Sequence, residues 1–103
     1  MSQLMIVTRW HVAPSLLHGR GVFVTLPIPQ GAPIDLAHYF DGHRWHATPL
    51  GRLHNHSLTP TAQSVRMGDQ RFLFASRDLL PGEEITVDYR LQPEFEQPQL
   101  GWR

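Results

Sequence analysis

Three short stretches of the sequence carry side chains that could bind a ligand or take part in chemistry. Gly19 and Gly21 stand just before an apolar run, where glycines let a ligand approach the backbone N–H and C=O groups. Residues 55–57, Asn-His-Ser, fit no hydrophobic period of 2 or 3.6. The segment PGEEITVDY ends in Asp88-Tyr89, and a phenol at a strand end can be a positioned hydrogen-bonding group. Taken singly, each also fits an ordinary role as a turn, a polar loop or a tyrosine that caps the core.

The histidines do not form a recognised metal site. His43 and His46 have the spacing of metal ligands, and His54 and His56 follow. No Asp, Glu or Cys accompanies them in a known pattern, and both pairs lie in apparent loop. We therefore predict surface or hydrogen-bonded histidines and no metal.

Two hydrolytic chemistries are also disfavoured. Ser57 follows a histidine but lacks the G-x-S-x-G turn of an activated serine. Glu83 and Glu84 are neighbours, so in a strand they point to opposite faces. They are therefore poor partners for glycosidase chemistry.

Length and composition predict one cytoplasmic domain of 103 residues. Nine basic residues, all arginine, balance nine acidic ones, so no net field draws the chain to nucleic acid or to an anionic membrane. Cysteine is absent, which excludes disulfides, thiolate zinc sites and cysteine nucleophiles. We see no signal-peptide pattern, and no apolar run approaches the ~18 residues of a membrane span.

Proline, glycine and β-branched residues predict a mostly β domain with little helix. Nine prolines and eight glycines interrupt the chain, which excludes long helices and leaves room for one or two helical turns. Between them lie runs of strand length, LMIVTRWHV, GVFVTL, RFLFAS and EITVDY. Residues 38–49 are polar, aromatic and aperiodic, and are predicted to be a loop.

Two segments repeat the same spacing. Ile28 to Ile34 and Leu79 to Ile85 each have an aliphatic residue, a glycine three positions later and an isoleucine three positions after that. Each follows a predicted strand, so both are expected to form a turn with glycine at positive φ and then a strand. They predict two similar hairpin-like units packed in one β-domain, since two copies are too few for a solenoid.

In their order along the chain, GRGVF, NHSxxP and GEEITVDY resemble the SET domain of protein lysine methyltransferases, in a minimal form of bacterial or viral type. The resemblance runs from about Val7 to Tyr89, and three ordered motifs at compatible spacing rarely coincide. It implies the SET fold, a β-clip of short curved sheets with a knot-like C-terminal segment. It also implies a single domain, 1–103, with a core of about 7–89 and a tail, 90–103, packed near the cofactor site.

The resemblance implies S-adenosylmethionine as the cofactor. The Gly-Arg-Gly backbone and the Asn side chain would meet the amino-acid end of the cofactor. The His backbone would face the adenine, which Trp102 or Phe95 of the tail could cover. The residues implied at the cofactor are Gly19, Arg20, Gly21, Asn55, His56 and Trp102.

The same resemblance implies a catalytic role for Tyr89, whose phenol would orient the substrate amine and line the lysine channel. Tyr39, the other tyrosine of the chain, is a candidate channel wall. The implied reaction transfers a methyl group to an accessible lysine of a protein or peptide substrate.

The sequence also departs from the family pattern. Thr61 stands where the pattern N-H-S-x-x-P-N ends in Asn, which is expected to loosen that turn. Only about twenty residues, 34–53, precede the Asn-His-Ser motif after the first repeated segment, where family members usually carry a longer substrate-binding insert. The flanking cysteine-rich zinc segments are missing as well. These losses would leave apolar surface for a second copy, so a homodimer is expected.

Two alternatives to a lysine methyltransferase remain open. One is a SET-fold module, weakly active or inactive, that binds a peptide or a partner protein; the other is an enzyme that acts on a small amine or another nonprotein substrate. The short insert favours the module, and the intact Asn55, His56 and Tyr89 favour the enzyme. No direct contact with nucleic acid or membrane is expected. A viral or secreted form would act in the host cell or its nucleus.

Overall fold

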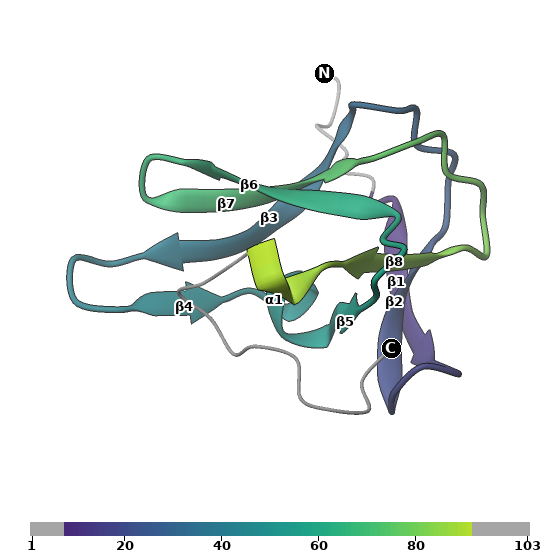
Figure 1. Ribbon diagram of the computed structural model, residues 1–103, viewed down its shortest axis with the longest axis horizontal. Helices are drawn as coiled ribbons and strands as arrows, with labels where there is room; N and C mark the ends of the chain where they lie inside the picture. Colours follow the sequence, from purple (N-terminus) through teal and green to yellow (C-terminus); the bar gives the residue numbers. More distant parts are fainter. Residues whose placement is uncertain (1–7, 92–103) are drawn as a thin grey trace, which may run out of the picture.

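The computed structural model describes residues 8–91 and arranges them in two four-stranded sheets (Figure 1). The strands are β1 (Trp10–Pro14), β2 (Arg20–Val24), β3 (Pro33–Phe40), β4 (Trp45–Ala47), β5 (Asn55–His56), β6 (Ala62–Met67), β7 (Gln70–Ala75) and β8 (Glu84–Val87). One sheet has the order β1-β2-β8-β5 and the other β4-β3-β7-β6. The helical elements in this part of the chain are the short helix α1 (Pro49–Leu53) and the 3-10 turn η1 (Tyr89–Leu91). The prediction of a mostly β domain with little helix is confirmed, and within residues 8–91 no helix is long and apolar enough to cross a membrane.

The two repeated segments contact each other directly. Ile28 and Leu79 occupy the same position in the two segments and exchange backbone N–H···O bonds of 3.0 and 2.8 Å. The turn glycines have positive φ, 81° at Gly31 and 93° at Gly82, as expected. Each glycine N–H also donates, at 2.8 Å, to the last residue of the strand that precedes the other segment. The two segments therefore bond to each other in the same way in both directions.

The prediction of two hairpin-like units is wrong in its strand pairing, because the strand after each turn pairs with a strand of the other unit. β8 pairs with β2, with Val22 opposite Ile85, and β3 pairs with β7. Each connecting segment is held to the other segment by backbone bonds. Each connecting segment therefore carries the chain to a strand of the other unit and does not fold it back beside the strand that precedes it.

Residues 38–49 belong largely to a sheet and do not form the predicted loop. β3 continues to Phe40, which lies opposite Trp45 of β4. Between them the Asp41 carboxylate accepts hydrogen bonds of 2.8 and 3.0 Å from two backbone N–H groups of the turn, and Gly42 has a φ of 99°. Asp-Gly is a strong hairpin signal, which the aperiodic aromatic and histidine side chains around it obscure.

One apolar cluster joins both sheets and both repeated segments. Along β7, Leu73 and Ala75 are buried in this cluster, whereas the alternate residues Phe72 and Phe74 are half-buried and lie on the opposite side of the sheet. We call this opposite side the outer face. In strand register its positions on β3, β6 and β7 are Pro33, Leu36, Tyr39, Gln63, Val65, Met67, Gln70, Phe72 and Phe74, and His46 of β4 lies opposite Tyr39 on the same face.

Helix α1 packs closely on β3 and delivers the chain to β5. Its N-cap Thr48 accepts the N–H of Gly51 at 3.2 Å and donates to the Leu36 carbonyl at 2.7 Å. A Cβ at Gly51 would lie 2.0 Å from the carbonyl oxygen of Ala37. The absence of a side chain at this position therefore sets how close the helix lies to the sheet.

Gly51→Ala should destabilise the protein by about 2 kcal/mol or more, because the added methyl group has to push the helix off the β3 backbone. Arg52→Ala, at the exposed neighbouring position, is the control and should change stability by less than about 0.5 kcal/mol. Urea denaturation of both variants measures the difference. Equal stabilities would show that the helix can shift at no cost.

Candidate functional site

Polar groups from three segments converge on the buried side chain of Asn55. β5 runs parallel to β8, with Asn55 opposite Thr86. The Asn55 amide nitrogen lies 3.1 Å from the carbonyl oxygen of His18 and 3.2 Å from that of Arg20. It also lies 2.8 Å from a carboxylate oxygen of Glu84. The structure thus brings together the Gly-Arg-Gly segment and the Asn-His segment that the sequence analysis singled out.

The two glycines beside Arg20 are required for different reasons. Gly19 has a φ of 45° and open space where a Cβ would stand, so the backbone conformation favours glycine there. At Gly21 a Cβ would lie 2.4 Å from Glu84 Oε2 and 3.1 Å from Asn55 Nδ2. Gly21 therefore makes room for two polar side chains of the site.

Glu84 is a site residue that the sequence analysis did not predict. The hydroxyl of Ser15 donates to the two carboxylate oxygens of Glu84 at 2.8 and 3.0 Å. This hydrogen bond connects the loop between β1 and β2 to β8. Its neighbour Glu83 instead forms a 2.6 Å ion pair with Arg77. The alternation of side chains along a strand is the sequence signal that separates the two acids.

Tyr89 is held by the two histidines that flank Asn55. Its hydroxyl donates to the carbonyl oxygen of His54 at 2.5 Å, and its backbone N–H donates to His56 Nδ1 at 3.0 Å. The rings of both histidines lie against the phenol ring, with centroids 5.4 and 5.2 Å away. Tyr89 is therefore more than a core cap with its hydroxyl in water, because its hydroxyl bonds to the residue next to Asn55.

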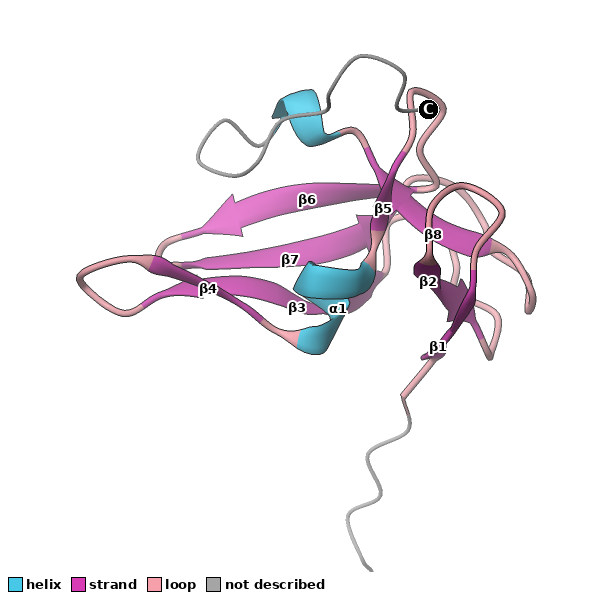
Figure 2. Cartoon of the chain, turned by 90° about the horizontal axis from the view of Figure 1, so that it is seen from below, coloured by secondary structure: helices cyan, strands magenta, loops and turns pink. Residues whose placement is uncertain are grey.

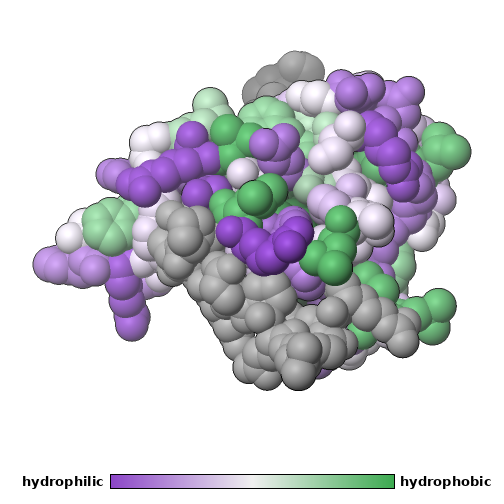
Figure 3. All heavy atoms as spheres, in the orientation of Figure 1, coloured by the Kyte–Doolittle hydropathy of each residue, from purple (hydrophilic) through white to green (hydrophobic). Residues whose placement is uncertain are grey.

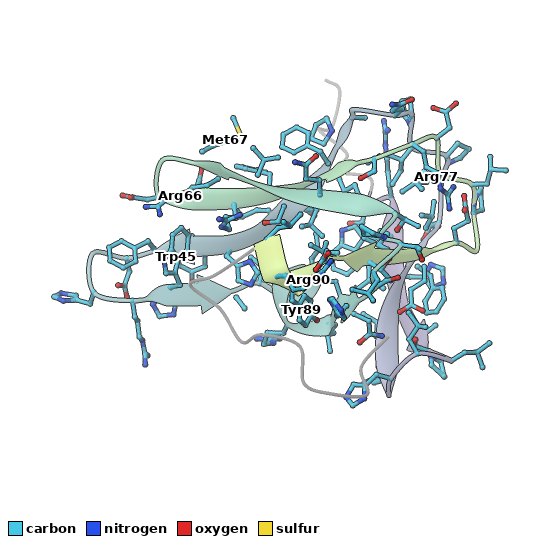
Figure 4. All side chains as sticks on the ribbon, in the orientation of Figure 1. Trp45, Arg66, Met67, Arg77, Tyr89 and Arg90 are labelled. Carbon is cyan, nitrogen blue, oxygen red and sulfur yellow. The ribbon has the colours of Figure 1, made fainter. Side chains whose placement is uncertain are left out.

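The surrounding elements place Tyr89 beside β5, in the turn that follows β8. Figure 2 shows β5 running between α1 on one side and η1 on the other. In Figure 4, Tyr89 and Arg90 lie near the middle of the molecule, whereas Trp45, Arg66 and Met67 lie toward one end and Arg77 toward the other. In the hydropathy view of Figure 3, hydrophilic and hydrophobic residues are interspersed over this face, including its middle.

Asp88 shapes the turn that carries Tyr89. Its buried carboxylate accepts the backbone N–H of Arg90 at 3.0 Å and pairs with the Arg90 guanidinium at 2.6 Å. The side-chain hydrogen bond from Arg90 holds the pKa of Asp88 below its usual range. Within the predicted Asp-Tyr pair, Asp88 thus fixes the start of η1 and Tyr89 presents the phenol.

Two buried histidines near Tyr89 are neutral at pH 7. His54 Nδ1 donates to the Leu50 carbonyl at 2.9 Å, and burial lowers the pKa of His54. The ring of His38 lies edge-on to that of His54, 6.1 Å away. Burial lowers the pKa of His38 to about 4, with further contributions from the charges of His54 and Arg71. Neither imidazole therefore brings a positive charge to the phenol.

Thr61 anchors its turn to β8, contrary to the loosening expected from the missing Asn. Its hydroxyl donates to the Glu84 carbonyl at 2.7 Å and accepts the N–H of Thr86 at 3.0 Å. Its own N–H donates to the Thr86 hydroxyl at 3.2 Å. The shorter side chain thus still connects the Asn-His-Ser segment to the strand beside it.

The remaining predicted residues are not brought to Tyr89. Tyr39 lies on the outer face, 41% exposed, and stacks on His46 with centroids 5.1 Å apart. His38, the neighbouring residue on β3, is the one that faces the site, so the role of Tyr39 as a channel wall stays a prediction. Trp102, Phe95 and the packing of the tail lie outside the described residues.

Trp45 is a further side chain that the sequence analysis did not single out. The guanidinium of Arg66 lies 5.1 Å from the centre of its ring, and both residues appear together in Figure 4. In strand register Arg66 lies opposite Arg71, which lies opposite His38. Arg66 is therefore on the same face of the sheet as His38. This is the face on the side of Tyr89, because the His38 ring contacts His54 and the His54 ring contacts Tyr89.

Histidines and carboxylates do not gather into a metal site within the described part of the chain. No group of three or more potential ligands occurs in residues 8–91. His46, one of the two histidines with ligand-like spacing, is 2.5 Å from Asp41, and this side-chain hydrogen bond lowers the pKa of Asp41. The bond helps to hold the turn between β3 and β4.

The arrangement suits a ligand that donates hydrogen bonds and carries positive charge. Within residues 8–91 every hydrogen bond of the Asn55 side chain goes through its nitrogen, which leaves its carbonyl oxygen for a ligand. The Glu84 carboxylate lies beside this amide. The phenol oxygen of Tyr89 has its one hydrogen committed to His54, so toward a ligand it acts as an acceptor.

Comparisons with known proteins identify relatives of this fold. The family model described as SET domain matches residues 34–90, more than half of the chain. Among solved structures, a Plasmodium falciparum protein named as a candidate histone methyltransferase has a TM-score of 0.69 at 19% identity, over 82% of this chain and 95% of that one. The methyltransferase domain of human PR domain-containing protein 2 has a TM-score of 0.61 at 17% identity, over 80% of this chain and 77% of that one. None of the curated proteins compared with the chain matches it.

Stability should fall as the pH is lowered from about 6.5 toward 4. His54 and His38 have lowered pKa values in the folded state, so in this range the unfolded chain binds protons that the folded chain excludes. For His38 the loss ends near its folded pKa of about 4. The carboxylate of Asp88, whose folded pKa is also lowered, contributes a separate loss only at lower pH.

Chemical denaturation between pH 4 and 8 tests this expectation. Each excluded proton adds a slope of about 1.4 kcal/mol per pH unit. His54→Phe keeps a ring against Tyr89 and removes the titrating group, so its slope should be smaller than that of the wild type. An unchanged slope in the variant would contradict the neutral state of His54.

Proposed function

The chain belongs to the SET domain family, and we propose that it is an S-adenosylmethionine-dependent protein-lysine N-methyltransferase. One observation carries the proposal. The phenol of Tyr89 bonds to the backbone of the residue next to Asn55, and Asn55 in turn bonds to the Gly-Arg-Gly segment. The three motifs that resemble the cofactor and catalytic segments of SET enzymes therefore form one connected site.

The residues present fit S-adenosylmethionine, which carries an ammonium group and a sulfonium group. The free carbonyl oxygen of Asn55 and the nearby Glu84 carboxylate are acceptors suited to an ammonium group. Gly19, Arg20 and Gly21 would meet the same end of the cofactor through their backbone. The backbone of His56, on the parallel strand pair, would face the adenine, and Trp102 of the tail could cover it.

The reaction requires a neutral amine held in line with a methyl group. S-adenosylmethionine, when bound, would supply an electrophilic methyl group, with the lysine Nζ as the nucleophile and the neutral thioether as the leaving group. The lysine has to lose a proton before it attacks. Burial and a nearby positive charge both lower the pKa of an ammonium group, and no side chain of the protein needs to be a strong base.

Tyr89 has a defined orientation for this step. Because its hydroxyl hydrogen is committed to His54, its oxygen accepts a hydrogen bond from the substrate amine and points the nitrogen lone pair toward the methyl group. Alignment of reacting atoms supplies several kcal/mol in favourable cases. The neutral His54 and His38 add no positive charge that would repel the lysine or the cofactor.

We also propose that the protein forms a homodimer through the outer face. Phe72 and Phe74 lie there, and their neighbours in register on β6 are Val65 and Gln63. None of the nine positions of this face on β3, β6 and β7 is charged, and His46 at its β4 edge is paired with Asp41. The chain as a whole has no net charge. A second copy presents the same neutral, apolar surface, so a two-fold contact brings no like charges together.

Tyr89→Phe should reduce methyl transfer by a factor on the order of 10² or more and leave cofactor binding nearly unchanged. The change removes one hydroxyl and keeps the ring between His54 and His56. Its effect should therefore appear in kcat, not in cofactor affinity. Labelled S-adenosylmethionine with cell lysate, followed by mass spectrometry, identifies the substrate, and turnover and calorimetric binding are then measured on one preparation.

The outcomes separate the possible functions. A Phe variant that keeps more than about half of the activity removes the catalytic role of Tyr89. Cofactor binding without transfer to any protein would indicate a binding module. Transfer only to a small amine would indicate a nonprotein substrate, and absence of cofactor binding would refute the proposal.

Val65→Arg should convert the dimer into a monomer, because it places a charge on the apolar contact beside Phe72. Leu58→Arg is a matched control, since Leu58 is 57% exposed, lies in the loop before β6 and is not one of the outer-face positions. Light scattering at tens of micromolar, roughly where weak dimers persist, measures the mass. A monomeric wild type, or a dimeric Val65→Arg variant, would contradict the proposal.

A further inference from the structure

We propose that Glu84 determines ligand specificity at this site by selecting a ligand with a cationic amino group beside Asn55. The inference rests on the proposed function, because the ligands concerned are S-adenosylmethionine and its product S-adenosylhomocysteine. It goes beyond that function by assigning a role to Glu84, which lies in the GEEITVDY motif but received no role at the site from the resemblance.

The surroundings of Asn55 fix which end of its amide faces the ligand. The amide nitrogen has three acceptors within 3.2 Å, the carbonyl oxygens of His18 and Arg20 and the carboxylate of Glu84. An NH₂ group donates two hydrogen bonds and accepts none. The flipped amide would place its oxygen against three acceptors, so the orientation with the nitrogen inward is strongly preferred. The amide oxygen is then the group that remains for a ligand, and it requires a donor.

The carboxylate of Glu84 favours a donor that is also positively charged. It is half-buried, and its partners are the hydroxyl of Ser15 and the amide of Asn55, both of which are neutral. Within residues 8–91 it forms no ion pair with a basic side chain. A carboxylate withdrawn from water is stabilised by a positive charge. A ligand ammonium group bonded to the Asn55 oxygen would supply that charge.

The close approach of β2 to the Glu84 carboxylate supports a role for Glu84 in ligand binding. Gly21 leaves the space that the carboxylate occupies, since a Cβ there would lie 2.4 Å from Glu84 Oε2. The carboxylate therefore lies against the Gly-Arg-Gly backbone, at the end of the site where the amino-acid part of the cofactor is proposed to bind.

A purely mechanical role is the competing explanation. Glu84 connects the loop between β1 and β2 to β8 through Ser15, and this connection alone would keep the site in shape. Gln is nearly isosteric with Glu and can keep hydrogen bonds to both Ser15 and Asn55. Glu84→Gln therefore removes the charge while largely retaining the connection.

Calorimetric binding of two ligands to the intact protein distinguishes the roles. The ligands are S-adenosylhomocysteine and its deaminated analogue, which keeps the carboxylate and lacks the amino group. The wild type should prefer S-adenosylhomocysteine. Glu84→Gln should weaken its binding on the order of tenfold or more, as expected for a lost interaction with a charged group, and should change binding of the deaminated analogue little.

Two further variants serve as controls. Glu83→Gln removes the neighbouring acid, which pairs with Arg77 on the other side of the strand, and should bind both ligands like the wild type. Ser15→Ala removes the connection to the loop but keeps the carboxylate, so it should retain the preference for the amino group. Melting of each ligand-free variant is measured first.

The preference within each variant decides the outcome. An equal loss for both ligands in Glu84→Gln, or a loss of preference in Ser15→Ala, would show a mechanical role and overturn the inference. A wild type that binds both ligands equally overturns the inference as well. The wild-type and Ser15→Ala measurements do not depend on Glu84→Gln, so they still test the inference if that variant does not fold. A wild type that binds neither S-adenosylhomocysteine nor S-adenosylmethionine would instead refute the proposed function itself.

Discussion

The reciprocal backbone bonds between the two repeated segments determine where β8 lies, and β8 positions the site. The bridge between Ile28 and Leu79, with the matching glycine bonds, carries β8 out of its own unit and against β2. The other edge of β8 then pairs with β5. As a result, the strand that carries the Gly-Arg-Gly segment and the strand that carries Asn55 lie on either side of β8. Without the exchange of strands between units, these two motifs would have no common neighbour.

This arrangement buries several polar side chains in a small domain, which is costly unless they find partners. Asn55, His56 and Asp88 are all buried and hydrogen-bonded. His54 is only partly satisfied, because its Nδ1 donates to Leu50 while its Nε2 is buried without a hydrogen-bond partner within residues 8–91. A buried polar atom of this kind destabilises the fold, and it lies on the residue whose carbonyl holds the phenol. The domain therefore gives up some stability at the point where the site is assembled.

The sequence predicted the parts of the fold that depend on local pattern. Turn glycines at Gly31 and Gly82, the strands that precede them and the scarcity of helix follow from spacing and composition. The partner of each strand does not, because the exchange between units depends on contacts between segments 51 positions apart. The residues of the site were likewise predictable only in part. The three motifs were visible in the sequence, whereas Glu84 gains its role only through the distances that join it to Asn55, Ser15 and Gly21.

The distribution of charge around the site follows from the same packing and bears on the chemistry proposed for it. A lysine and a sulfonium ion are both unfavourable next to further positive charge, since like charges repel strongly where water is excluded. Three of the groups around the phenol meet this constraint. Burial keeps the two imidazoles of His54 and His38 neutral, and Arg90 is paired with Asp88. Glu84, the one carboxylate near Asn55 without a cationic partner within residues 8–91, lies toward the Gly-Arg-Gly segment. The site thus combines neutral imidazoles near the phenol with a negative region at Asn55. This charge pattern suits the proposed cofactor, whose sulfonium lies between its adenosine and its amino-acid part and whose ammonium lies at the amino-acid end.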